Sequence, residues 1–196
     1  MLVLAISGLN TLMLSEDVLI LHYYVNDAAI GQYGIITAIV GLIAIGKSAV
    51  NAIFVPDFAK SIQEKRSPDA KNLFNLSRTL STLWAVFALG ILLLVFAFAP
   101  QWVAIPRKSI FLSIIIFLAL GKLSSAMIGP CTNVMFINGG AALIAWSVLT
   151  ACVLNFFGNL ALVPFYGLLG AAISTGLSIM ALNLWQFAHV KKRYKF

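Results

Sequence analysis

The sequence predicts an all-α integral membrane protein in which six transmembrane helices form one bundle. Of its 196 residues, 61% are hydrophobic and only 10% are charged, and the mean hydropathy is +1.00. Soluble domains carry about 25% charged residues. The apolar residues fall into six successive runs of about 20 residues, which is the length that a helix needs to cross a bilayer.

The six apolar runs are joined by short connections and one longer basic segment. The helices are expected at 3–25, 32–57, 79–99, 110–134, 142–163 and 168–190. The basic segment, 59–78, is predicted to be a cytoplasmic loop. Within it, Ser67, Pro68 and Asp69 provide an N-cap residue, a proline at the first helical position and an acid in the first turn. The third helix is therefore expected to begin near Pro68 and to rise into the bilayer.

The distribution of Lys and Arg predicts the orientation. Nine of the 13 basic residues lie in 59–78 and 191–196, and only Arg107 and Lys108 lie in the other connections. By the positive-inside rule, both termini are cytoplasmic, which requires an even number of helices. These membrane-edge residues account for the net charge of +7, so no nucleic-acid partner is predicted.

Two further features concern the start of the chain and its cysteines. No basic residue precedes the first helix and no signal-peptide pattern is visible, so we expect that sequence is missing upstream. Cys131 and Cys152 lie in apolar runs without metal or redox spacing, and they are expected to be small buried hydrophobic residues. No metal site is predicted.

Two lysines lie deep inside the predicted spans. Lys47 is roughly 22 Å from the outer end of its helix and Lys122 is roughly 18 Å from the outer end of its own. An ionisable residue at this depth is costly and usually functional. A buried charge is seldom kept for stability alone, because a packed apolar residue serves as well.

Small and polar residues form stripes at helical spacing. The stripes comprise Thr37, Gly41, Ala44, Ser48 and Asn51; Gly121, Lys122, Ser125, Gly129 and Thr132; Ser147, Ala151, Asn155 and Gly158; and Ser7, Asn10 and Asp17. Each stripe could be a packing face, but the two lysines favour a water-filled cavity lined by four helices. Helix 79–99 has an apolar stretch expected to face lipid, and Gly167, Ala171, Ser174 and Ser178 suggest close packing of the last helix.

Two adjacent acids, Glu16 and Asp17, lie roughly 12 Å from the outer end of the first helix. Asp17 shares a face with Asn10, whereas Glu16 points about 100° away, towards lipid or a neighbouring helix. Either the acids are hydrated or paired with cations, or one of them binds Na⁺ or H⁺ during transport. Both are candidate ion-coupling residues.

Two stretches resemble a known family. The first is EDVLILHYYVNDAAIGQYGIITAI (16–39) followed by NAIFVPDFAK (51–60), and the second is LNFFGNLALVPFYGLLGAAISTGLS (154–178). The second contains Asn-x-x-x-Asn and then Pro-x-x-Gly-x-x-Gly-Ala-Ala. The chain thereby resembles the C-terminal six-helix half of polysaccharide repeat-unit (O-antigen type) flippases, within the multidrug, oligosaccharidyl-lipid and polysaccharide exporter superfamily.

This resemblance implies half of a two-bundle exporter that moves an undecaprenyl-diphosphate-linked oligosaccharide across the cell inner membrane by alternating access. It implies no enzymatic cleavage, no catalytic residue and no cofactor beyond a coupling ion. A diphosphate carries about two negative charges, and cations at mid-membrane are a suitable receptor for it. The candidate substrate-binding residues are Lys47, Lys122, Asn51, Ser125 and Asn155. The expected partners are the lipid-linked substrate, membrane lipids and a missing N-terminal half.

Three alternatives remain open. A cation-coupled multidrug antiporter of the same superfamily would have acids rather than lysines in its cavity. A membrane enzyme acting on the same lipid is disfavoured, because no cluster of His, Asp or Arg accompanies a large outer loop. A truncated, non-transporting fragment is suggested by the uncharged start of the chain.

Overall fold

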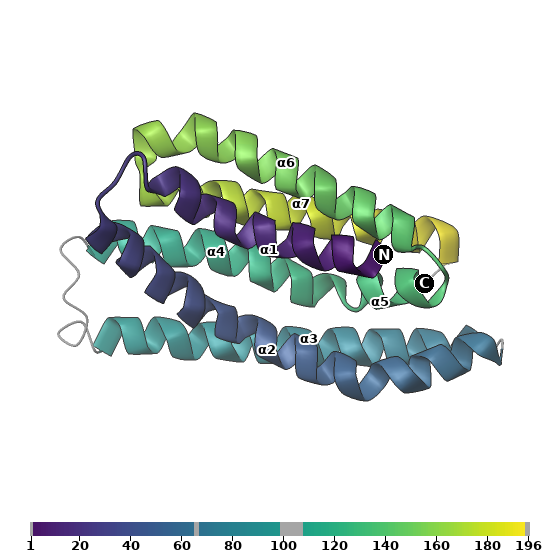
Figure 1. The fold of residues 1–196 in the computed structure, drawn as a ribbon. Helices are drawn as coiled ribbons and strands as arrows, with labels where there is room; N and C mark the ends of the chain where they lie inside the picture. The colour runs from purple at the N-terminus through teal and green to yellow at the C-terminus, as the bar shows by residue number, and fades with distance from the viewer. Residues whose placement is uncertain (1, 65–66, 99–107, 195–196) are drawn as a thin grey trace.

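The computed structural model describes residues 2–64, 67–98 and 108–194, and these residues form an antiparallel helical bundle without strands (Figure 1). Six of its helices are long and apolar enough to cross a membrane, which confirms the predicted six-helix bundle. The elements are α1 (Leu2–Leu21), α2 (Asp27–Gln63), α3 (Ser67–Phe98), α4 (Lys108–Ile128), α5 (Cys131–Ile137), α6 (Ala141–Tyr166) and α7 (Leu168–Tyr194).

The basic segment 59–78 is helical over most of its length, so the prediction of a loop was wrong. Helix α2 continues to Gln63 and α3 begins at Ser67, with Asp69 in its first turn. Polar side chains do not interrupt a helix that has left the hydrocarbon region, because their charged ends reach water. The start of α3 lies where Ser67, Pro68 and Asp69 predicted it. Of the segment, 65–66 lies outside the described residues.

The predicted fourth helix, 110–134, is interrupted. Helix α4 ends at Ile128 and the short α5 begins at Cys131. Between them, Gly129 has a positive φ of 84° and Pro130 has no N–H to continue the hydrogen-bond ladder. The apolar sequence runs on through the break, so composition alone predicted one continuous helix.

Replacing Gly129 by alanine is expected to destabilise the protein more than the same change at Gly139. Both residues have positive φ, where an alanine costs about 1–2 kcal/mol. A Cβ at Gly129 would also lie 3.1 Å from the Cβ of Arg78, whereas a Cβ at Gly139 meets nothing within 4 Å. Reversible unfolding in mixed detergent micelles measures both variants, and equal losses of unfolding free energy would contradict the difference.

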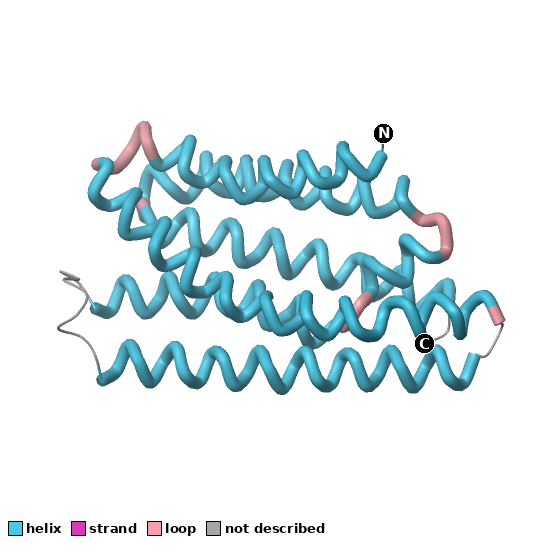
Figure 2. The backbone as a smooth tube through the Cα atoms, turned by 60° about the horizontal axis from the view of Figure 1, so that its bottom comes forward, coloured by secondary structure: helices cyan, strands magenta, loops and turns pink. Residues whose placement is uncertain are grey.

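The helices pack in two groups that share α4. Helices α1, α6 and α7 contact one another, α2 packs along α3, and α4 contacts α7 on one side and both α2 and α3 on the other. The helices run side by side, with turns near their ends (Figure 2). Gly121 of α4 approaches Gly176 of α7 so closely that an added Cβ would lie 3.2 Å from the Cα of Gly176.

One end of the bundle carries several basic residues, and one face is strongly apolar. The first residues of α1, the end of α2, the start of α3 and the end of α7 lie at the same end of the bundle (Figure 1). This end carries Lys60, Lys71 and the basic last turn of α7. Helix α3 exposes a row of large apolar side chains, including Leu83, Phe87 and Leu94, as expected for a lipid-facing helix.

Candidate functional site

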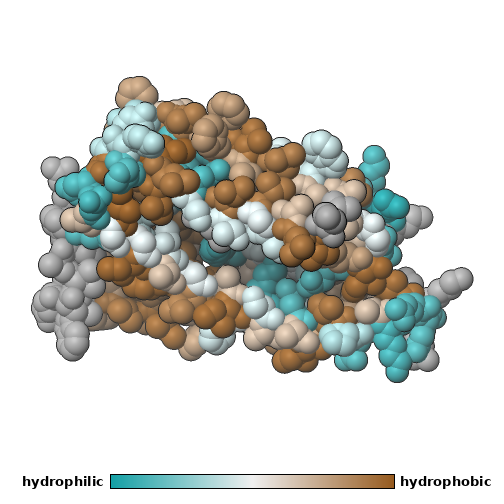
Figure 3. Space-filling view, in the orientation of Figure 1, coloured by the Kyte–Doolittle hydropathy of each residue, from teal (hydrophilic) through white to brown (hydrophobic). Residues whose placement is uncertain are grey.

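A cavity of about 210 Å³ lies between α1, α2, α4, α5 and α7. Figure 3 shows hydrophilic surface in a hollow of an otherwise largely apolar face. The polar residues that line the cavity are Asn10, Lys47, Lys122, Ser125, Thr132, Asn183 and Gln186. Its apolar lining includes Met13 from α1 and Ile43 from α2. The cavity therefore has a mixed polar and apolar lining, and it has room for several water molecules.

Lys47 reaches across this cavity from α2 to α4. Its Nζ donates hydrogen bonds to the backbone oxygen of Ser125 at 2.8 Å and to the Oγ of the same residue at 2.6 Å. An ammonium group has three donors, so one remains for a ligand. The side chain is half-buried and its charge is only partly compensated by these neutral acceptors.

Lys122 lies on α4, about one turn before Ser125, and lines the same cavity. It is half-buried and forms no hydrogen bond or ion pair with the residues that the structure describes. The structure thus brings Lys47, Lys122 and Ser125 together. The two lysines converge from different helices, as their similar depths predicted.

The α7 side of the cavity supplies polar residues that the sequence reasoning missed. The Oε1 of Gln186 accepts from the Oγ1 of Thr132 at 2.7 Å, and its Nε2 donates to the Oγ of Ser147 at 2.9 Å. The Nδ2 of Asn183 donates to the backbone oxygen of Ile179 at 2.8 Å. The stripe Gly167, Ala171, Ser174 and Ser178 predicted only a packing face for helix 168–190, and Asn183 and Gln186 lie on another side of that helix.

Asp17 lies in a separate buried cluster between α1, α2, α6 and α7. Its side chain has little exposure, at 3%, and accepts four hydrogen bonds. The donors are the Nδ2 of Asn155 at 2.9 Å and of Asn159 at 2.7 Å, the OH of Tyr33 at 2.9 Å and the Oγ1 of Thr175 at 2.6 Å. These bonds offset the cost of burying the carboxylate.

The Asp17 cluster changes the interpretation of Asn155. Asn155 is fully buried and also accepts from the hydroxyl of Ser174, at 3.0 Å from its Oδ1. The residues that line the lysine cavity do not include it. The structure therefore places Asn155, a candidate substrate-binding residue, beside Asp17, a candidate ion-coupling residue. Asn159 is a further partner of Asp17 that was not among the candidate residues, although it is the second Asn of the Asn-x-x-x-Asn pattern.

Glu16 points away from Asp17, towards α6. Its Oε2 accepts a weak hydrogen bond from the thiol of Cys152 at 3.5 Å. Its Oε1 is buried and has no hydrogen-bond partner among the described residues. The two adjacent acids thus have different surroundings, and only Asp17 is surrounded by donors.

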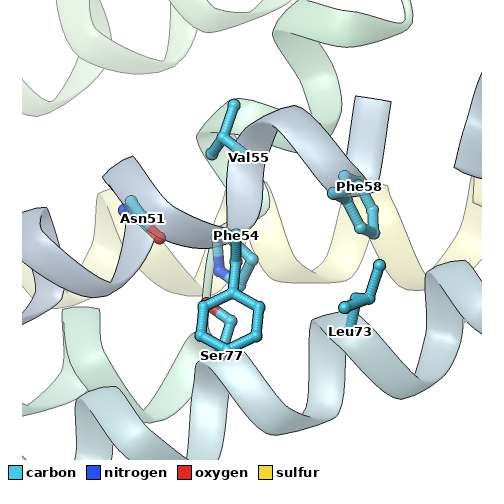
Figure 4. Close-up of a pocket in the computed structure, with 7 residues that line it drawn as sticks. Asn51, Phe54, Val55, Phe58, Leu73 and Ser77 are labelled. Carbon is cyan, nitrogen blue, oxygen red and sulfur yellow. The ribbon is translucent and has the colours of Figure 1, made fainter. Parts of the chain in front are cut away.

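Asn51 lies apart from the lysine cavity. It lines a pocket of about 10 Å³ together with Phe54 and Ser77, shown in Figure 4. The Oδ1 of Asn51 and the Oγ of Ser77 are both buried without a partner among the described residues, and the pocket is about large enough for one water. Of the predicted α2 stripe, only Ala44 lines the lysine cavity, and Ser48 is exposed.

Among the described residues, no group of three or more His, Cys, Asp or Glu side chains is placed to hold a metal ion. The charged residues that line the lysine cavity are Lys47 and Lys122, and Asp17 lies in its separate cluster. Comparisons of the chain with protein-family models, with curated proteins and with solved structures find no match.

Proposed function

We propose that the chain is the C-terminal half of a transporter that flips undecaprenyl-diphosphate-linked oligosaccharide across the cell inner membrane. The observation that carries this proposal is the convergence of Lys47 and Lys122 on one polar cavity within a bundle of membrane-spanning helices. Two cations at this depth are costly unless an anion meets them during function. A diphosphate headgroup supplies about two negative charges, which complements the pair.

The rest of the cavity suits a sugar diphosphate. The hydroxyls of Ser125 and Thr132 and the amides of Asn10, Asn183 and Gln186 offer hydrogen bonds to phosphate oxygens or sugar hydroxyls. The apolar residues between them favour entry of a lipid-linked molecule. In this proposal a second six-helix bundle covers the cavity, alternating access exposes it to each leaflet in turn, and both termini are cytoplasmic.

The proposed coupling site is Asp17, with Na⁺ or H⁺ as the ion. The carboxylate is held between four helices by Tyr33, Asn155, Asn159 and Thr175. A change in its charge would alter contacts of α1, α2, α6 and α7 at once. Glu16 is the secondary candidate, because its Oε1 lacks a partner among the described residues.

The alternative of a cation-coupled multidrug antiporter is less well supported. Such a transporter needs negative charge where its cationic substrate binds. The described residues that line the cavity include two lysines and no Asp or Glu, since both acids of α1 lie outside the lining. The cavity thus repels the substrates that this class carries.

A transport assay in proteoliposomes tests the proposal. The complete two-bundle transporter is reconstituted, and movement of a fluorescent polyprenyl-diphosphate oligosaccharide between leaflets is followed by quenching from outside. We expect movement of the diphosphate and much slower movement of a matched neutral lipid-linked oligosaccharide. Equal rates for the charged and neutral lipids, or efflux of a cationic drug in place of either, would contradict the proposed function.

A further inference from the structure

The break between α4 and α5 leaves backbone groups that need partners. The last four carbonyls of a helix have no N–H partner within it, and Pro130 has no N–H to offer. The break is buried on one side, where Ala126, Pro130 and Cys131 lie, whereas Met127 on the other side is exposed. A buried carbonyl without water requires a donor from elsewhere in the protein.

Two cations of the α2–α3 hairpin supply donors to this helix end. The Nζ of Lys47 donates to the carbonyl of Ser125 at 2.8 Å, and the Nε of Arg78 donates to the carbonyl of Met127. A cation at a helix C-terminus also interacts favourably with the helix dipole. Lys47 belongs to α2 and Arg78 to α3, so both helices of the α2–α3 hairpin donate side-chain hydrogen bonds to the end of α4.

The two remaining carbonyls are also satisfied. The carbonyl of Ala126 accepts from the N–H of Gly129 at 3.2 Å. The hydroxyl of Thr82 lies 3.4 Å from this carbonyl, but it donates its one proton to the carbonyl of Arg78 at 2.8 Å. The carbonyl of Ile128 accepts from the thiol of Cys131 at 3.5 Å. Two of the four carbonyls that end α4, those of Ser125 and Met127, are therefore held by side chains of the α2–α3 hairpin.

We propose that Lys47 and Arg78, together with the last turn of α4, form a joint that an anion in the cavity opens. The coupling to an anion rests on the proposed function. Lys47 belongs to both structures, because its ammonium lines the cavity and caps Ser125. A diphosphate offers several charged oxygens, and these are stronger acceptors than a neutral carbonyl. Beyond the one donor that Lys47 leaves free, a bound diphosphate therefore also competes for the two donors that Ser125 holds.

Arg78 is the positioning residue in this joint. It does not line the cavity, so it does not contact the anion bound there. The guanidinium of Arg78 also lies over the ring of Phe187, with its Cζ 5.8 Å from the ring centroid, which fixes it between α4 and α7. Its contacts therefore set how firmly the hairpin is held against α4 before the anion arrives.

Cys131 provides a reporter for opening of the joint. It is the first residue of α5, it is only 2% exposed, and its thiol donates to the last carbonyl of α4. The sequence contains one other cysteine, Cys152 on α6, which lies away from the break. A maleimide reacts with a thiol that is exposed to water. The labelling rate of Cys131 therefore reports on opening of the joint, and the labelling rate of Cys152 reports on whether the rest of the bundle stays folded.

The test uses the whole chain in lipid nanodiscs, with maleimide labelling of each cysteine resolved by peptide mass spectrometry. Arg78→Ala should label at Cys131 about tenfold faster than wild type, because it removes a hydrogen bond from a charged group. Arg78→Lys should restore slow labelling, and Lys71→Ala, on the same helix, should resemble wild type. Cys152 should label alike in all variants, which shows that they remain folded.

The coupling is tested with inorganic pyrophosphate, against chloride at equal ionic strength. Pyrophosphate should speed the labelling of Cys131 in wild type and add little in Arg78→Ala, where the joint is already open. If Arg78 has a purely structural role, pyrophosphate should speed the labelling of Cys131 as much in Arg78→Ala as in wild type. Binding of radiolabelled pyrophosphate is measured separately by equilibrium dialysis.

Three outcomes overturn the inference in different ways. If Cys131 is labelled at the same rate in Arg78→Ala as in wild type, the proposed joint does not exist. If pyrophosphate binds but the labelling rate of Cys131 in wild type does not change, the coupling is contradicted and the proposed function stands. Absence of pyrophosphate binding overturns the proposed anion site and the coupling together, and the Arg78→Ala result still decides whether the joint exists.

Discussion

Replacing Lys122 by methionine is expected to abolish transport of a lipid diphosphate while leaving the protein folded. Lys122 is half-buried and unpaired among the described residues, so an apolar side chain of similar length removes a charge without breaking a contact. Loss of a buried charge pair with the substrate costs about 2 kcal/mol or more, equivalent to at least about 30-fold in rate. Initial rates in the proteoliposome assay measure the loss.

The matched control is Lys71→Met, which removes a lysine of α3 outside the cavity and should leave the transport rate unchanged. The unfolding free energy of Lys122→Met should equal or exceed that of wild type, because a lone charge in the membrane is unfavourable. A Lys122→Met transporter that keeps more than half of the wild-type rate would rule out the cationic cavity as the substrate site.

Replacing Asp17 by alanine is expected to give the largest loss of stability in the chain. The change leaves buried donors of Tyr33, Asn155 and Asn159 without their acceptor. The hydroxyl of Thr175 also loses Asp17, but it can turn to the Oδ1 of Asn155 at 3.3 Å. An unsatisfied buried donor costs about 1–3 kcal/mol, so the summed loss should be at least about 3 kcal/mol. Unfolding by detergent titration, followed by circular dichroism, measures it.

Asp57→Ala provides the comparison for Asp17→Ala. Asp57 lies in α2 and is exposed, so its replacement should change the unfolding free energy by less than about 0.5 kcal/mol. Similar small losses for both variants would mean that the Asp17 cluster contributes no more to stability than an exposed acid does.

The sequence predicted the spanning helices and the start of α3 because these depend on local composition. A run of about 20 apolar residues has few alternatives in a membrane, and Pro68 favours a helix start. The convergence of Lys47 and Lys122 also followed from sequence, because their depths could be counted from the helix ends. The break at Gly129 was missed although glycine followed by proline is a helix stop signal, since the apolar run continued past it.

The stripes predicted common faces but not the neighbours of those faces. Asn155 shares a helix face with Ser147, and Ser147 accepts a hydrogen bond from Gln186 near the cavity. Asn155 lies about two turns further along α6, where its neighbour is Asp17 of α1. On α2, the cavity side begins at Ile43 and Lys47, so Ser48 lies on the exposed side. Helical spacing fixes which side chains share a face, whereas rotation and depth are set by packing against helices distant in sequence.

The α2–α3 hairpin is joined covalently to the other helices at only one end of the bundle. The α2–α3 hairpin follows the end of α1 and precedes the start of α4, and both of these lie opposite the termini (Figure 1). Lys47 is 20 residues from the start of α2, roughly 30 Å along the helix. A tilt of the hairpin by about 10° about its attached end therefore displaces the Lys47 level by roughly 5 Å, about one helical turn. Side-chain contacts alone oppose this displacement, so the width of the cavity is adjustable without any change in the helices themselves.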